Sequence, residues 1–354
     1  MTDTTMQNSN SETGSPPVAA PDATAGTGTK KMTMVEAINL AIADAMEADP
    51  KVLALGEEVG DREEGGVMGV TKGLSTRFGD NRVKSTPISE QAIIGAAIGA
   101  SIGGYRPVAE IMLMNFVTVA MDMITNHAAK LRFMSGGQTN VPIVIRTMTG
   151  SGFSTGGQHS DYLEAWFAHT PGIKVVTPSN PDDAYGLMRS AIEDNDPVLF
   201  IEHLPSYWTP GEVTRTHVPI GKAKVVREGR DVTLIGHSRG VLDGLAAAAK
   251  LEGEGVSVEV VDLRTVSPWD RETVLASVRK TGRALIVHEA VRQFGIGAEI
   301  AATIHEELWG TLKGPVKRLG GAFSPVPFSK PLETAFVPSQ DEIAETLRQL
   351  AVLG

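Results

Sequence analysis

The sequence contains no cysteine, and this absence excludes several chemistries at once. Disulfides, thiolate nucleophiles and cysteine-ligated metals cannot form, and a chain without thiols is compatible with a reducing cytoplasm. The eight histidines show no HExxH or similarly tight ligand spacing, so a histidine-based catalytic metal has no support. The chain also lacks a P-loop and a G-x-G-x-x-G motif, so it has no phosphate-binding loop of its own.

Basic runs and long apolar runs are missing as well. With a formal net charge of −10, the chain has no clustered Lys and Arg to neutralise phosphates, so nucleic acid is not an expected partner. The longest weakly polar run, residues 92–104, is shorter than the roughly 20 residues that span a bilayer. Residues 1–30 have neither the apolar core nor the basic start of a targeting peptide, and we expect a disordered tail there. These features predict a soluble, cytoplasmic protein without a membrane partner.

The remaining chain alternates apolar helical patterns with short apolar strands. Residues 33–50 predict a helix with Thr33 as its N-cap, residues 117–137 predict a long helix, and "VPIVIRTMTG" reads as a buried parallel strand. Proline and polar residues cluster at 206–222. This alternation predicts an α/β fold with mostly parallel sheets in two domains, residues 31–205 and 223–354, joined by a linker at 206–222.

A five-residue match raises a hydrolase as one alternative. "GHSRG" at 236–240 follows a strand and opens a helix, as a G-x-S-x-G nucleophile elbow does. Asp262 and His288 follow Ser238 in the order that a catalytic triad would need. Too few strands separate Ser238 from Asp262 for the hydrolase fold, and no HGGG-type loop lies upstream. The simpler interpretation is a strand-to-helix turn that needs glycine.

Glu90 stands at the start of an unusual helix. The run "EQAIIGAAIGASIGG" places Gly95, Gly99 and Gly103 every four residues, and each interior glycine costs about 1 kcal/mol relative to alanine. Such a stripe of small residues predicts close packing against another subunit. Alone, Glu90 could simply complement the helix dipole. However, Glu57, Glu110 and His159 also lie at predicted strand ends or loops, which indicates a shared polar pocket.

An ordered set of motifs extends from about Thr33 to the C-terminus. It includes "GEEV", "TKGL", "TPISE", "YRPVAEIM", "AAKLRFMSGGQ", "QHSD", "KVVTPSNPDDA", "DPVLFIEH", "VDLRTVSPWD" and "GRALIVHEA". In these motifs the chain closely resembles the beta subunit of the thiamine-diphosphate-dependent decarboxylase component of 2-oxo acid dehydrogenase complexes. The resemblance implies a transketolase-like fold, with a pyrimidine-binding domain followed by a transketolase C-terminal domain.

The resemblance also implies roles for particular residues. Glu90 matches the glutamate that contacts a ring nitrogen of the aminopyrimidine and promotes deprotonation of the thiazolium carbon. Ile88 and Phe116 match residues that pack on the pyrimidine, Glu57 matches an acid near the cofactor, and His159 matches the histidine that faces the substrate. For Glu90, we expect Ile88, its apolar neighbours and a facing subunit to raise the pKa by desolvation.

Other implications concern ions and partners. A structural potassium site would use Ile143, Ala191 and Ile192, with Asp194 and Asp196 nearby. The GDG…NN signature that holds Mg²⁺ and the diphosphate is absent, so an alpha subunit would supply it in a two-alpha, two-beta heterotetramer that serves a lipoyl-bearing acyltransferase core. The substrate is pyruvate in the leading interpretation, with acetoin and then branched-chain 2-oxo acids as alternatives.

Overall fold

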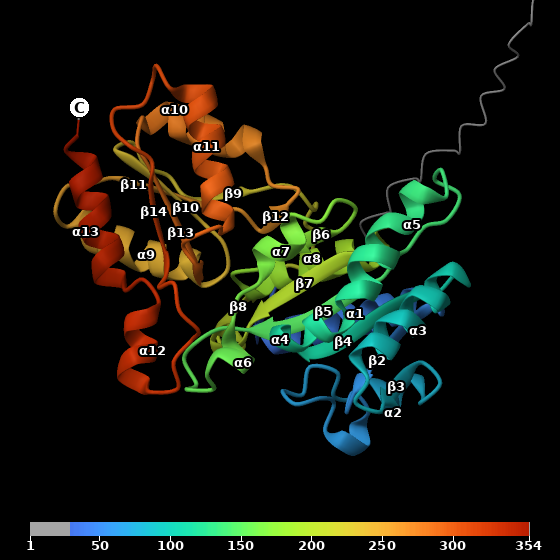
Figure 1. Cartoon of the computed structure of the whole chain (residues 1–354). Coiled ribbons are helices and arrows are strands. Elements are labelled where there is room, and N and C mark those ends of the chain that lie inside the picture. The colour runs from blue at the N-terminus through green and yellow to red at the C-terminus, as the bar shows by residue number, and fades with distance from the viewer. Residues whose placement is uncertain (1–28, 354) are drawn as a thin grey trace, which may run out of the picture.

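The computed structural model describes residues 29–353 and places their strands in three sheets. Seven strands form the sheet of the N-terminal part, and five form the sheet of the C-terminal part. A short antiparallel pair joins β1 (Lys30–Thr33) to β8 (Pro210–Val213). The two larger sheets occupy separate regions of the molecule, with helices packed around each (Figure 1). Most of the tail predicted at residues 1–30 lies outside the described residues.

The first sheet is parallel except at one edge. Its strand order is β12-β6-β7-β5-β4-β2-β3, and only the β12–β6 pair is antiparallel. The central strands β5 and β7 are buried along their whole length, as expected for strands in the middle of a parallel sheet. The strands are β2 (Val52–Glu57), β3 (Val83–Thr86), β4 (Arg106–Leu113), β5 (Val144–Thr149), β6 (Lys174–Val176), β7 (Val198–His203) and β12 (Thr265–Ser267).

The second sheet has the order β14-β13-β10-β11-β9. Only β9, at one edge, runs antiparallel to its neighbour. Its strands are β9 (Lys224–Arg227), β10 (Val232–Gly236), β11 (Val258–Asp262), β13 (Ala284–Val291) and β14 (Lys317–Gly321). The predicted α/β fold with mostly parallel sheets in two parts is therefore confirmed.

Helices surround both sheets, and their starts follow local capping chemistry. The predicted N-cap Thr33 is confirmed: it forms a capping box with Glu36 at the start of the first helix. The α-helices are α1 (Met34–Ala48), α2 (Leu74–Phe78), α3 (Glu90–Ile102), α4 (Met114–Val117), α5 (Ala129–Met134), α6 (Gly157–Ser160), α7 (Glu164–Ala168), α8 (Pro181–Glu193), α9 (Arg239–Glu252), α10 (Arg271–Thr281), α11 (Ile296–Leu308), α12 (Lys330–Phe336) and α13 (Gln340–Ala351). None of the helices within residues 29–353 is long and apolar enough to cross a bilayer.

Residues 117–137 do not form the single regular α-helix that the sequence predicted. The segment changes from a 3₁₀ turn (Thr118–Ala120) to a π-helical turn (Met123–Ala128) and then to α5. Over so few residues, 3₁₀-, π- and α-helical turns all keep their apolar side chains on one side. The spacing of the apolar residues therefore does not distinguish these helix types. Gly136 and Gly137, both with positive φ, follow the end of α5.

One hydrophobic core extends across both parts of the chain. Ile145 of the first sheet and Phe167 of α7 belong to the same buried cluster as Ile235 and Ile286 of the second sheet. The strand β12 also joins the two parts. It follows β11 of the second sheet in sequence but pairs with β6 of the first sheet. The two parts thus share a buried core, and the side chains within this core are shielded from water.

Candidate active site

The predicted catalytic and cofactor residues gather at one edge of the first sheet. Glu57 is the last residue of β2, and Glu90 follows β3 at the start of α3. Phe116 lies in α4, directly after β4, and His159 lies in α6, after β5. Because β2, β3, β4 and β5 are parallel, their carboxyl ends lie at the same edge, which is where α/β sheets bind ligands.

Glu57 and Glu90 are close enough for their charges to interact. Glu57 is 9% exposed, and Glu90 is half-buried. Burial first, and the charge of Glu90 second, raise the pKa of Glu57, while the backbone amide of Ser89 opposes this rise. The Oε1 atom of Glu57 is buried and has no hydrogen-bond partner among residues 29–353. Such a carboxyl pair can hold a shared proton or accept a hydrogen bond from a ligand.

The apolar surroundings predicted for Glu90 are only partly present in this chain. Ile93 and Ile94 are buried in the core, whereas Ile88 is 81% exposed. The exposed face of α3 consists mainly of small residues, including Ala96 and Gly99, and a Cβ atom added at Gly99 would meet nothing within 4 Å. Desolvation of Glu90 is therefore incomplete within one chain, and a neighbouring molecule could approach α3 closely.

Phe116 and His159 contact each other across two short helices. Their ring centroids are 5.6 Å apart with an interplanar angle of 73°, an edge-to-face arrangement. Asn115 fixes this arrangement, since its Nδ2 donates hydrogen bonds to the carbonyl of Gly157 at 2.8 Å and to Asp161 Oδ2 at 3.0 Å. The Nδ1 atom of His159 is buried and has no partner within residues 29–353, so this imidazole retains an unused hydrogen-bonding atom.

Glu110 was predicted to belong to this polar pocket, but it has a different role. Its carboxylate forms a buried ion pair with Arg146, and the guanidinium of Arg146 also binds Glu202, with an Nη2–Oε2 distance of 2.7 Å. Tyr207 donates a further hydrogen bond to Glu202. The charge of Glu110 is thus neutralised inside the sheet, and the group links β4, β5 and β7 rather than offering a free base.

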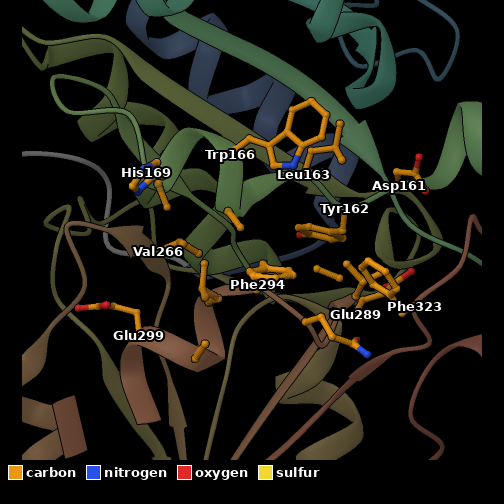
Figure 2. Close-up of a pocket in the computed structure, with 18 of the residues that line it drawn as sticks. Asp161, Tyr162, Leu163, Trp166, His169, Val266, Glu289, Phe294, Glu299 and Phe323 are labelled. Atoms are coloured by element: carbon orange, nitrogen blue, oxygen red, sulfur yellow. The ribbon is translucent and has the colours of Figure 1, made fainter. Parts of the chain in front are cut away.

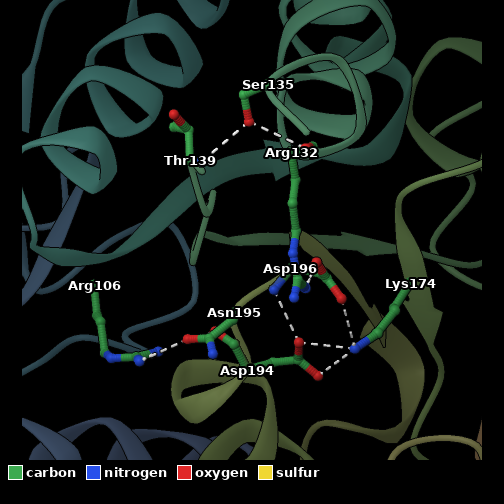
Figure 3. A network of polar contacts seen from close by, with 8 residues as sticks. All are labelled: Arg106, Arg132, Ser135, Thr139, Lys174, Asp194, Asn195 and Asp196. Carbon is green, nitrogen blue, oxygen red and sulfur yellow. Dashed lines mark hydrogen bonds and ion pairs between the residues drawn. The ribbon is translucent and has the colours of Figure 1, made fainter. Parts of the chain in front are cut away.

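The predicted potassium ligands lie at the opposite edge of the sheet and do not fit a potassium ion. The carbonyl of Ile192 accepts a hydrogen bond from Arg106 at 3.0 Å. The carboxylate of Asp194 binds Lys174, and that of Asp196 binds both Lys174 and Arg132 (Figure 3). The carbonyl of Ile143 accepts from the amide of Val198 at 2.9 Å, and Ala191 lies in the last turn of α8. The sequence prediction overlooked these cationic side chains, which are distant along the chain.

Ser238, Asp262 and His288 do not form the catalytic triad that a hydrolase would need. Ser238 is 2% exposed, and its Oγ has no hydrogen-bond partner among the described residues, although its φ of 50° resembles that of a nucleophile elbow. Asp262 accepts a hydrogen bond from Ser179 instead of orienting a histidine. The Nδ1 atom of His288 is 3.0 Å from the carbonyl of Ala290. The tight turn at Ser238 therefore serves the strand-to-helix connection.

A large groove lies between the two parts of the chain, apart from the predicted site. It has a volume of about 1180 Å³ and is mostly apolar (Figure 2). Tyr162, Trp166 and Phe294 are among the side chains that line it, with Glu289 as one of its few polar groups. None of Glu57, Glu90, Phe116 and His159 lines this groove.

Between two lining residues of this groove, Leu163 and Ala165, stands a buried acid that the sequence did not reveal. Glu164 in α7 is fully buried, and neither of its carboxylate oxygens has a hydrogen-bond partner in the part of the chain described. Burial raises the pKa of Glu164 to about 8. Burial also lowers the pKa of His237, whose Nε2 is 3.9 Å from Glu164, to about 3. Both groups are therefore neutral near pH 7, and their proximity is not an ion pair.

Comparisons with known proteins place this chain in a class. The family described as "Transketolase, pyrimidine binding domain" matches residues 30–208, and "Transketolase, C-terminal domain" matches residues 221–343. Among solved structures, the chain described as "Split gene transketolase, inactive beta4 tetramer" has a TM-score of 0.75 and 22% identity over 91% of this chain and 99% of that chain. The fold is that of the transketolase-like, thiamine-diphosphate-dependent class.

Curated relatives narrow the class to one family. The beta subunit of acetoin:2,6-dichlorophenolindophenol oxidoreductase of Cupriavidus necator is 45% identical, over 90% of this chain and 97% of its own length. A pyruvate dehydrogenase E1 beta-1 subunit of Arabidopsis thaliana is 44% identical, over 91% and 90% respectively. The acetoin oxidoreductase beta subunit of Bacillus subtilis is 43% identical. The chain belongs to the family of beta subunits of 2-oxo acid dehydrogenase E1 components and related acetoin oxidoreductases.

Proposed function

We propose that this chain is the beta subunit of a thiamine-diphosphate-dependent dehydrogenase of the pyruvate dehydrogenase type, active only together with an alpha subunit. The observation that carries the proposal is the identity of 43–45% to E1 and acetoin oxidoreductase beta subunits over about nine-tenths of the chain. Acetoin cleavage is the second candidate, because relatives with that name are as similar as the pyruvate dehydrogenase subunits. Branched-chain 2-oxo acids are a third.

In this proposal, four residues form this chain's half of the site. Phe116 and Ile88 would hold the aminopyrimidine between apolar surfaces, and Glu90 holds the proton that it shares with a ring nitrogen. Glu57 adds a second carboxyl to this half of the site, and burial together with the charge of Glu90 raises the pKa of Glu57. When bound, thiamine diphosphate supplies a nucleophilic ring carbon that attacks carbonyl groups.

His159 is proposed to face the substrate. Its ring is oriented by Phe116, and the buried Nδ1 is available for a hydrogen bond. A buried polar atom without a partner costs about 1–3 kcal/mol, so a ligand that supplies one gains affinity. The buried Oε1 atom of Glu57, at the same edge of the sheet, also has no hydrogen-bond partner among the described residues. A ligand that donates a hydrogen bond to this atom would gain affinity in the same way.

The other half of the site is assigned to the alpha subunit. Residues 29–353 contain no cluster of three His, Asp or Glu side chains that could hold a metal ion. The GDG…NN signature is also absent from the sequence, and on this ground we assign Mg²⁺ and diphosphate binding to the partner, within a two-alpha, two-beta heterotetramer that acylates the lipoyl groups of an acyltransferase core in the cytoplasm. Residues 31–205 are proposed as the pyrimidine-binding domain, 206–222 as the linker and 223–354 as the C-terminal domain.

The exposed face of α3 is the proposed docking surface for the alpha subunit. A Cβ atom at Gly99 would meet nothing within 4 Å in the single chain, and leucine favours the helix more than glycine does, so we expect Gly99→Leu not to lower the melting temperature of the folded chain. The same side chain would block close approach of a partner helix. We expect Gly99→Leu to abolish co-purification with the alpha subunit, whereas Gly310→Leu, at an equally open position after α11, should leave it intact.

The substrate is tested by dye-reduction assays on the co-expressed alpha and beta subunits with thiamine diphosphate and Mg²⁺. Pyruvate, acetoin and branched-chain 2-oxo acids are compared at equal concentrations. The proposal expects turnover of pyruvate above the other substrates. Preferential turnover of acetoin would establish the second candidate, and turnover of none of them would contradict the proposed function.

A further inference from the structure

The amino-terminal edge of the first sheet carries a polar cluster far from the proposed active site. Lys174 begins β6, Arg106 begins β4, and Asp194 and Asp196 lie in the turn between α8 and β7. Arg132 reaches this turn from α5 (Figure 3). The strands β4, β6 and β7 are parallel to those of the active-site edge, so the cluster occupies the opposite edge and has a structural role.

The carboxylates of the turn are already bound by an ammonium group. The Nζ atom of Lys174 lies 2.8 and 2.6 Å from the two carboxylate oxygens of Asp194 and 3.2 Å from Asp196 Oδ2. An ammonium group has the charge of a potassium ion and is of similar size, and it binds as a compact point charge with three donors. On the other side of Asp196, Arg132 Nη1 is 2.5 Å from Oδ1.

The backbone carbonyls of the turn are engaged as well. Arg106 Nη1 donates to the carbonyls of Ile192 and Asp194 at 3.0 and 2.9 Å. The carbonyl of Asn195 accepts from the amide of Val141 at 3.2 Å, and the carbonyl of Pro197 accepts from the amide of Lys174 at 2.9 Å. Among the predicted ligands, the carbonyls of Ile143 and Ile192 and the carboxylates of Asp194 and Asp196 therefore already bind donors from neighbouring elements.

The charges of the cluster also oppose a further cation. The positive charges of Arg106, Arg132 and Lys174 exceed the negative charges of Asp194 and Asp196 by one. A potassium ion would enter a region that already carries a net positive charge, and it would have to displace hydrogen-bonded donors. The site is only partly buried, since Lys174 and Asp196 side chains are 27% and 28% exposed, so water screens but does not remove this repulsion.

We propose that Lys174, supported by Arg132 and Arg106, takes the place of a structural monovalent cation, so that this fold is stabilised without potassium. The ammonium group joins the start of β6 to the turn before β7, and Arg132 ties the same turn to α5. The proposal concerns stability alone and is independent of the substrate of the enzyme.

The test is the melting temperature of the full-length chain in potassium, sodium and choline chloride at equal ionic strength. The unchanged chain should melt within about 1 °C in all three salts, because no ion is taken up on folding. A selective increase of several degrees in potassium would overturn the proposal. This comparison needs no variant, so it does not depend on whether a substituted chain folds.

A variant of Lys174 tests whether its ammonium group takes the place of a cation. Lys174→Ala exposes the two carboxylates and lowers the charge of the cluster, so we expect a lower melting temperature in choline that potassium raises by about 2–4 °C. Lys130→Ala is the matched control, because Lys130 lies on α5 and contacts only Asn126 among the described polar groups. A Lys174→Ala chain that gains no more from potassium than the control would show that the ammonium does not occupy a cation site.

Discussion

Replacing Glu164 by Gln should change how the stability of the chain depends on pH. Glu164 is buried between the two parts of the chain, and its pKa is raised from 4.5 to about 8. Below about pH 4.5 the carboxyl is protonated in both folded and unfolded chains. Between about 4.5 and 8 the unfolded chain releases this proton and the folded chain keeps it, so stability falls as the pH rises. Above about pH 8 both states are ionised, and the loss is complete.

The size of this effect follows from the displacement of the pKa. Each unit corresponds to about 1.4 kcal/mol, so Glu164 alone should lower the free energy of unfolding by on the order of 5 kcal/mol across the window. The amide introduced by Glu164→Gln does not titrate, so the variant loses this slope. The glutamine side chain would also bury an amide group without a hydrogen-bond partner, which costs about 1–3 kcal/mol at every pH. The difference in slope between the two chains is therefore the diagnostic quantity.

The assay is urea unfolding of both chains at a series of pH values from about 5 to 8. Asp262, whose pKa is raised by burial to about 7, contributes a slope of the same sign to both chains, so it cancels in the comparison. Glu306→Gln is the control, because Glu306 is an exposed glutamate on α11. Parallel stability profiles for Glu164→Gln and the unchanged chain would refute the reasoning.

Three further predictions follow from the described contacts. Arg146→Met leaves Glu110 and Glu202 buried without their cation, so the free energy of unfolding measured in urea should fall by about 3–5 kcal/mol; a loss under about 1 kcal/mol would contradict the ion-pair role. Thr33→Ala removes the N-cap of α1, so the same measurement should show a loss of about 1 kcal/mol, with no loss counting against the cap. Glu90→Gln should reduce dye reduction by the alpha–beta pair by about 100-fold or more without changing its melting temperature, and near-normal activity would remove the proton-holding role.

Much of the fold was predictable because its signals are local. Short segments that begin with apolar β-formers, such as those of β5 and β7, identify buried parallel strands, and Thr33 with Glu36 identifies a helix start. The gathering of Glu57 and Glu90 was also predictable, since residues that follow parallel strands meet at one edge of the sheet. The edge-to-face contact of Phe116 with His159 depends on loop geometry that no local pattern encodes.

The remaining features depend on contacts between distant segments. The pairing of β12 with β6 and the burial of Glu164 arise only when the two parts of the chain pack together. Likewise, the family resemblance implies that Asp194 and Asp196 lie near a cation, and only the folded chain brings Lys174 to both carboxylates. The apolar surroundings predicted for Glu90 are only partly supplied by this chain, because Ile88 is exposed.

We propose that this chain holds one half of an active site that an alpha subunit completes. The most direct measurement is dye reduction with pyruvate and acetoin by the chain alone, by its alpha partner alone and by the co-expressed pair, each with thiamine diphosphate and Mg²⁺. The claim predicts turnover only by the pair. Equal turnover by this chain alone would contradict it.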